Sequence, residues 1–103
     1  MSQPAHSIRF DSAAHTLQID GRNIPLTGIE RRLVALLVSR FGTAISHADI
    51  RRLVWGEAWN GGDEALRVTV NRLRKKMETD QRKPEILVSV RGVGYRMNGN
   101  LST

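Results

Sequence analysis

The stretch LRVTVNRLRKKM, residues 66–77, decides the fold of this chain. On a helical wheel of about 100° per residue, one face of the segment is apolar and the opposite face is mostly polar. The apolar face consists of Leu66, Val70, Leu73 and Met77. The opposite face consists of Val68, Asn71, Arg72 and Lys75. The segment is therefore expected to form a helix that buries its first face in the core and exposes the second.

The exposed side of this helix carries charge of one sign. Residues 67–76 contain no acidic side chain and five cationic ones, which are Arg67, Arg72, Arg74, Lys75 and Lys76. A helix face that meets only water usually mixes both signs at i and i+4, because opposite charges attract there. A solvated charged face remains one interpretation, but the self-repulsion of the segment favours an anionic partner.

The whole chain is also basic. Its 103 residues contain 16 Lys and Arg against 10 Asp and Glu, which gives a formal net charge of +6. This balance favours nucleic acid as a partner over an anionic membrane surface. The longest apolar run, residues 33–38, is too short to cross a bilayer. We therefore predict one soluble, unexported domain over residues 1–103, with an ordered core at about 8–97 and tails at 1–7 and 98–103.

Short strands and a tight turn are predicted on both sides of the helices. The predicted strands cover residues 7–10, 15–19, 22–26, 85–90 and 95–97. Asp20-Gly21 between the second and third strands is a dipeptide that a type I′ turn prefers, because both of its central residues need a positive φ. The N-terminal strands then form an antiparallel meander, and the last two form a β-hairpin.

Three helices are expected between these strands, over about residues 28–40, 47–55 and 63–79. Thr27 and Glu30 have the spacing of a capping box, in which each side chain accepts from the backbone N–H of the other residue. Ser46 and Asp63 are expected to cap the second and third helices in the same position. The fold class is therefore α+β.

An enzyme or a metal centre finds little support in this sequence. The chain has no cysteine, and its three histidines, His6, His15 and His47, lack metal-ligand spacing. We therefore expect no cofactor and no bound metal. Binding of RNA or single-stranded DNA would call for stacking aromatic residues on an open sheet, which are not evident. A module that binds only other proteins remains an alternative to a DNA-binding domain.

Four segments carry a resemblance to a known family. They are FDSAAHTLQIDGRNIPLTGIE, LVWG, LRVTVNRLRKKME and VSVRGVGYRM, which together span most of residues 8–97. The chain resembles the DNA-binding effector domain of the OmpR/PhoB family of bacterial response regulators. The resemblance implies a winged helix-turn-helix fold, in which the third helix enters the major groove of double-stranded DNA and the C-terminal hairpin, the wing, reaches the minor groove. It also implies a cytoplasmic transcription regulator of a two-component system.

The resemblance implies specific contacts. The residues expected at or near base edges are Arg67, Val68, Thr69, Asn71 and Arg72. Those expected at phosphates are Trp55, Arg74, Lys75, Lys76, Ser89 and Tyr95. Those expected at the minor groove are Arg91 and Gly92. Structural roles remain open for three of these residues: Arg74 as an ion-pair partner near the core edge, Trp55 as a core aromatic and Tyr95 in sheet packing.

Other implied partners lie outside the helix and the wing. The loop GEAWNGG, with Glu57, Trp59 and Asn60, occupies a place that in the family can contact RNA polymerase, although the ring of Trp59 is expected to fold onto the core. Tandem binding to direct repeats is also implied. The family often has an acidic residue where this chain has Arg67, and a basic one where it has Asn71, so the operator cannot be copied from a relative. No receiver domain is expected within these 103 residues.

Overall fold

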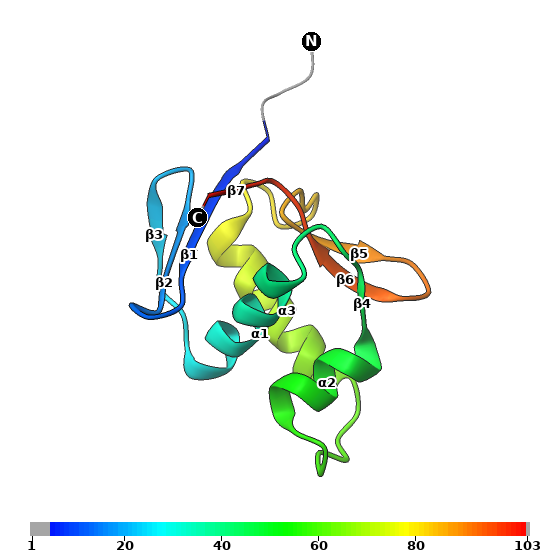
Figure 1. Ribbon diagram of the computed structural model, residues 1–103. Helices are drawn as coiled ribbons and strands as arrows, with labels where there is room; N and C mark the ends of the chain where they lie inside the picture. The colour runs from blue at the N-terminus through cyan, green and yellow to red at the C-terminus, as the bar shows by residue number, and fades with distance from the viewer. Residues whose placement is uncertain (1–4, 103) are drawn as a thin grey trace.

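Residues 5–102, the part of the chain that the computed structural model describes, form three α-helices and seven β-strands (Figure 1). The helices are α1 (Gly28–Ser39), α2 (His47–Trp55) and α3 (Glu64–Met77). The strands are β1 (Ser7–Asp11), β2 (Thr16–Ile19), β3 (Arg22–Ile24), β4 (Ile45–Ser46), β5 (Leu87–Val90), β6 (Gly94–Met97) and β7 (Asn100–Ser102). The predicted α+β class and the order of its main elements are confirmed.

The N-terminal strands form a four-stranded sheet in the order β3-β2-β1-β7. The turn between β2 and β3 has φ values of 51° at Asp20 and 81° at Gly21, as predicted for a type I′ turn. The expectation of a C-terminal tail from residue 98 is wrong for the described part of that segment, because β7 pairs parallel with β1. Three residues are too few for an alternating pattern to distinguish a strand from a loop.

The second sheet has the order β4-β6-β5 and contains the C-terminal hairpin. The two residues of β4 were not predicted as a strand. They pair with β6, where Ile45 lies opposite Tyr95 and Ser46 opposite Gly94. A Cβ atom on Gly94 would lie 1.9 Å from the carbonyl oxygen of Ile45. Only glycine therefore allows these two strands to approach so closely.

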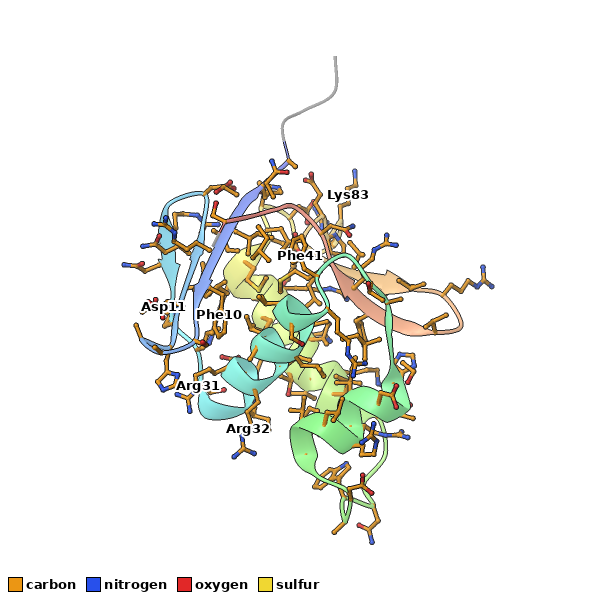
Figure 2. All side chains as sticks on the ribbon, viewed as in Figure 1. Phe10, Asp11, Arg31, Arg32, Phe41 and Lys83 are labelled. Atoms are coloured by element: carbon orange, nitrogen blue, oxygen red, sulfur yellow. The ribbon has the colours of Figure 1, made fainter. Side chains whose placement is uncertain are left out.

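The apolar face of α3 lies at the centre of the core. Its members are at most 1% exposed, and they are Leu66, Val70, Leu73 and Met77. Figure 1 shows α3 between the four-stranded sheet and the hairpin, with α1 packed beside it. Arg31 and Arg32, by contrast, project outward from α1 (Figure 2). The face predicted from the helical wheel is thus the face that the fold buries.

Two of the three predicted side-chain caps are present in the structure. Thr27 and Glu30 form the complete capping box of α1, and the Ser46 hydroxyl accepts from the backbone N–H of Asp49 at the start of α2. The expected side-chain cap of α3 is absent, because Asp63 makes no capping bond within α3. Its carboxylate instead accepts from the Arg51 guanidinium of α2. An ion pair has replaced the cap, and it ties α2 to the beginning of α3.

The predicted third helix ends two residues early, at Met77 instead of Thr79. Glu78 takes an extended conformation, with φ of −83° and ψ of 146°, and its side chain is 8% exposed. Its carboxylate accepts from the backbone N–H groups of Glu85, Ile86 and Leu87 at 2.8 to 3.1 Å. Satisfying these donors at the start of β5 stabilises the turn back into the hairpin.

A buried ion pair joins α1 to the end of α3. The Lys76 ammonium donates to Glu30 Oε1 at 2.6 Å and to the carbonyl oxygen of Pro25 at 2.9 Å. Glu30 is only 2% exposed. Burial opposes its ionisation, but the hydrogen bonds from Lys76 and Thr27 outweigh burial and hold the pKa of Glu30 below its ordinary value. The ionised carboxylate is therefore the form that the fold contains.

We expect Lys76→Ala to lower the free energy of unfolding by about 1.5–3 kcal/mol, because it leaves a buried carboxylate without its charged donor. Urea unfolding at neutral pH measures the change. Lys75→Ala is the matched control, since Lys75 is exposed and has no ion-pair partner among residues 5–102. Equal stability of the two variants would contradict a structural role for Lys76.

Another ion pair holds the beginning of β1. His6 Nδ1 lies 2.6 Å from Asp20 Oδ2, and His6 Nε2 lies 3.7 Å from Glu85 Oε2. The hydrogen bond to Asp20 is the main cause that raises the pKa of His6. The same bond, together with the backbone N–H of Ser7, lowers the pKa of Asp20. The pair is therefore strongest where His6 is protonated and Asp20 is ionised.

This pair predicts a pH-dependent contribution to stability. Because the folded pKa of His6 is raised, its contribution is complete below the ordinary histidine value and disappears as the pH rises through the raised value. Wild type should therefore exceed His6→Gln in unfolding free energy most clearly near about pH 5.5 and least near about pH 8.5. Urea unfolding across this pH range tests the prediction. His15→Asn is the control, because His15 is exposed and asparagine tolerates its positive φ. A difference that does not change with pH would contradict the prediction.

Candidate nucleic-acid interface

The exposed side of α3 presents two cations that have no acidic partner in the described structure. We call the surface formed by Val68, Asn71, Arg72 and Lys75 the α3 face. Asn71, Arg72 and Lys75 are exposed, and Val68 is half-buried. Within residues 5–102, neither Arg72 nor Lys75 has a carboxylate within 4 Å. This uncompensated charge can be met by an anion from outside the protein.

Three other residues expected on this helix are held by neighbours. Arg67 lies at the edge of the α3 face and pairs with Glu64 at 2.8 Å, although 65% of its side chain is exposed. Thr69 is 6% exposed, and its hydroxyl donates to the carbonyl oxygen of Ala65 at 2.8 Å. Lys76 makes the ion pair with Glu30 described above. Thr69 and Lys76 therefore lie outside the α3 face.

Arg74 connects α3 to the hairpin. Its Nε donates to the carbonyl oxygen of Leu87 at 3.0 Å, and its Nη2 donates to the Ser89 hydroxyl at 3.0 Å. The guanidinium also lies over the Tyr95 ring, 5.7 Å from the centroid. Arg74 therefore has a structural role, but the ion pair considered for it is wrong, because no acid lies within 4 Å of its guanidinium among residues 5–102. Its partners are a carbonyl, a hydroxyl and an aromatic ring.

The hairpin tip carries another exposed cation. Arg91 and Gly92 are exposed at the turn between β5 and β6, where Gly92 has a φ of 77° and the N–H of Val93 donates to the carbonyl oxygen of Val90. Val93 is 43% exposed. Figure 1 shows the hairpin extending from the body of the domain, away from the four-stranded sheet. An arginine at such a tip can reach a surface that α3 also contacts.

Tyr95 and Ser89 lie between α3 and this tip. Tyr95 is 7% exposed and belongs to the core, where its ring packs edge-on against His47 with centroids 5.3 Å apart. This confirms the role in sheet packing that the sequence left open. Its hydroxyl has no hydrogen-bond partner among residues 5–102 and is not enclosed, so it reaches the surface. Ser89 is exposed and accepts from Arg74.

The end of α2 and the loop after it hold two tryptophans. Trp55 is half-buried and packs against the core, which confirms its structural role. Trp59 was expected on the core, and this is wrong: it is 42% exposed and packs against Trp55, with ring centroids 6.3 Å apart. Gly61 lies beneath its ring, where a Cβ atom would come within 2.3 Å. No periodicity in the loop could have indicated this local stacking.

The remaining loop residues named from the sequence are exposed. Glu57 pairs with Arg52 at 3.3 Å, and Asn60 lies at the surface. The loop brings these residues beside Trp59, while Leu53 at 43% exposure adds an apolar side chain on α2.

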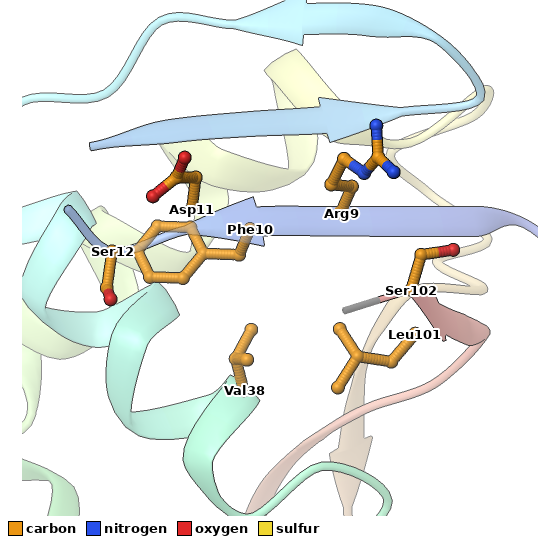
Figure 3. Close-up of a pocket in the computed structure, with 7 residues that line it drawn as sticks. All are labelled: Arg9, Phe10, Asp11, Ser12, Val38, Leu101 and Ser102. Atoms are coloured by element: carbon orange, nitrogen blue, oxygen red, sulfur yellow. The ribbon is translucent and has the colours of Figure 1, made fainter. Parts of the chain in front are cut away.

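Other parts of the described chain offer weaker sites. A hollow of about 500 Å³ lies between β1, β7 and α1, where Phe10, Val38 and Leu101 surround it and Arg9 and Asp11 extend from β1 (Figure 3). Its lining has both signs of charge and no reactive pair. Among residues 5–102, no three His, Asp or Glu side chains are placed to hold a metal ion. None of the helices described here has the length and apolarity needed to cross a bilayer.

Comparison with known proteins agrees with this geometry. Residues 21–97 match the family described as "Transcriptional regulatory protein, C terminal". The chain is 37% identical over 92 residues to the transcriptional regulatory protein AfsQ1 of Streptomyces coelicolor, an alignment that covers 89% of this chain and 41% of AfsQ1. The chain thus spans less than half the length of this relative.

Solved structures share the fold. The DNA-binding domain of Bacillus subtilis CssR is 32% identical, with a TM-score of 0.72 over 88% of this chain and 99% of that one. The DNA-binding domain of Klebsiella pneumoniae RstA, in complex with the RstA box, is 23% identical, with a TM-score of 0.75 over 85% of this chain and 87% of that one. The fold is a winged helix, and the chain belongs to the OmpR/PhoB-type family of transcriptional regulatory protein C-terminal domains.

Proposed function

We propose that this domain binds double-stranded DNA with sequence specificity, as the effector part of a bacterial transcription regulator in the cytoplasm. The observation that carries the proposal is the α3 face. It exposes Arg72 and Lys75, which have no acidic partner in the described part of the chain, and the hairpin adds Arg91 at its tip. The CssR and RstA domains are described as DNA-binding, and RstA binds its box. The role is one of recognition, without a catalytic step.

The α3 face has the chemistry that base edges in the major groove require. The groove is about 12 Å wide and admits a helix. Arg72 suits the two acceptors of guanine, Asn71 suits the acceptor and donor of adenine, and Val68 suits the thymine methyl group. Arg67 lies at the edge, where it must leave Glu64 to reach a base. Thr69 is not part of the proposed base contacts, because it is buried and bonded within the helix.

Phosphate contacts are proposed on both flanks of α3. Lys75 is free to meet a phosphate, and the indole N–H of Trp55 is neither enclosed nor bonded to another described residue. Ser89 and Tyr95 offer hydroxyls near Arg74, whose guanidinium keeps unused N–H groups. Such contacts set affinity and register without reading sequence. Lys76 is not among them, since Glu30 holds it.

The wing is proposed to enter the adjacent minor groove. Arg91 would insert its guanidinium there, and narrow A·T-rich stretches attract such a charge most strongly. Gly92 would allow the tip to turn tightly against the DNA backbone.

Further partners are proposed on the basis of family membership and exposure. The loop with Glu57, Trp59 and Asn60 would contact RNA polymerase, and the exposed ring of Trp59 favours a protein contact there. Two copies would bind side by side on direct repeats. The exposed Leu53 and Trp59 also favour the second candidate function, a module that binds protein alone.

Selection from randomised 30-base-pair duplexes at near-physiological salt tests the function. Enrichment of a motif would support sequence-specific binding, and two copies about one helical turn apart would support tandem binding. Binding without enrichment that disappears as salt rises would contradict it, because only the non-specific electrostatic part would remain. Protein binding through the Trp59 loop would then be the better account.

Arg72→Ala and Lys75→Ala should differ in how they change DNA binding. Arg72→Ala should cost about 1–3 kcal/mol and relax the preference at one base position. Lys75→Ala should weaken binding to all sequences alike and lower the salt slope by about one. Binding titrations against the selected duplex and its single-base variants measure both effects. A uniform loss across sequences for both variants would show that Arg72 reads no base.

Arg91→Ala should weaken binding most when the sequence beside the major-groove site is rich in A·T, because the narrow minor groove there attracts the guanidinium. Two duplexes with the same central site and either A·T-rich or G·C-rich flanks provide the comparison, and the central site serves as an internal control. An equal loss on both duplexes would overturn the minor-groove contact.

A further inference from the structure

A hollow of about 290 Å³ lies beside the C-terminal half of α3, against the turn that leads to β5. Its lining consists of Asn71, Arg74, Lys75, Gln81 and Arg82. Three of these residues are cations, the other two carry amide groups that donate hydrogen bonds, and no acid lines the hollow. Two of them, Gln81 and Arg82, come from a turn to which the sequence assigned no role. The set of donors fits an oxygen-rich anion.

The cations around this hollow are largely free to bind such an anion. Arg74 uses two of its five N–H groups, on Leu87 and Ser89, so three remain. Lys75 has no ion-pair partner among residues 5–102. Arg82 is the exception, because its Nε lies 3.4 Å from Asp80 Oδ1. That side chain is 85% exposed, however, and an exposed pair of this kind contributes little, so the guanidinium can turn to another anion.

The position of the hollow indicates where the anion comes from. Asn71 and Lys75 belong both to the α3 face and to the lining, so the hollow continues this face on the side of the 80–83 turn. A helix in the major groove is flanked by the phosphates of the two strands. An anion at this place is therefore one that the DNA itself supplies.

We propose that this hollow binds one backbone phosphate of the DNA at the edge of the major groove, with Arg82 and Gln81 as contacts from the turn after α3. The inference rests on the proposed function and extends it to a segment outside both the recognition helix and the wing. Arg74 thereby serves two surfaces: two of its N–H groups hold the hairpin, and the others face the phosphate.

The salt dependence of Arg82→Gln tests this contact on any duplex. One lost phosphate contact lowers the salt slope by about 0.9, so the affinity difference from wild type should shrink about 3.5-fold between roughly 50 and 200 mM salt. Lys83→Gln is the matched control, because it also removes one positive charge. Lys83 follows Arg82 directly in the chain, and its side chain is exposed and does not line the hollow (Figure 2). The proposal would be overturned if the affinity difference between wild type and Arg82→Gln did not change with salt, or if Arg82→Gln and Lys83→Gln had the same salt slope.

Neutral methylphosphonate substitutions in the duplex locate the contact. One neutral linkage is introduced at a time. At the bound phosphate it should weaken wild type and Lys83→Gln more than Arg82→Gln, because Arg82→Gln has already lost one of the contacts to that phosphate. Equal losses for all three proteins at every position would overturn the site. Because the salt comparison needs no preferred sequence, a chain that binds DNA without specificity would contradict the proposed function while this contact could still be upheld.

Titration with inorganic phosphate separates the two sources of the anion. Amide shifts at residues 71–82 in wild type, together with unaltered DNA binding by Arg82→Gln, would assign the hollow to free phosphate and overturn the DNA contact.

Discussion

Burial of one face of α3 is the constraint on which the rest of this domain depends. Once Leu66, Val70, Leu73 and Met77 enter the core, the helix can no longer rotate about its axis, and the residues opposite to them must face outward. Contacts on its two flanks strengthen this orientation: Lys76 bonds to α1 on one side, and Arg74 bonds to the hairpin on the other. The packing of the buried apolar side of the helix thus determines where the α3 face lies.

Much of this architecture was accessible from local patterns. The capping box at Thr27 and Glu30 and the turn at Asp20-Gly21 are local rules, and both hold. Two short strands, β4 and β7, were missed, because each forms only where distant backbone comes alongside it. Asp63 failed as a cap for a similar reason, because a guanidinium from α2 competes for its carboxylate.

The candidate site was predicted less completely than the fold. Lys75 and Lys76 are neighbours with the same chemistry. Lys76 is bonded to a buried carboxylate, whereas Lys75 has no ion-pair partner in the part of the chain that the structure describes. The sequence alone does not show which lysine an acid can reach. Thr69 was placed near the bases, but a hydroxyl in a helix can satisfy itself on the carbonyl four residues earlier. Trp59 was expected on the core, but its ring packs instead against Trp55, which is close to it in the chain.

The contacts of Arg74 with Leu87, Ser89 and Tyr95 also matter for transferring the α3 sequence to another scaffold. This one side chain links the helix to the hairpin, and so relates the positions of the two surfaces that are proposed to contact DNA. A graft that moved only the α3 sequence into another scaffold would lose that link unless the hairpin supplied the same carbonyl, hydroxyl and ring. In the proposed mode of binding, a change in α3 that displaced Arg74 would therefore also shift the hairpin relative to the DNA.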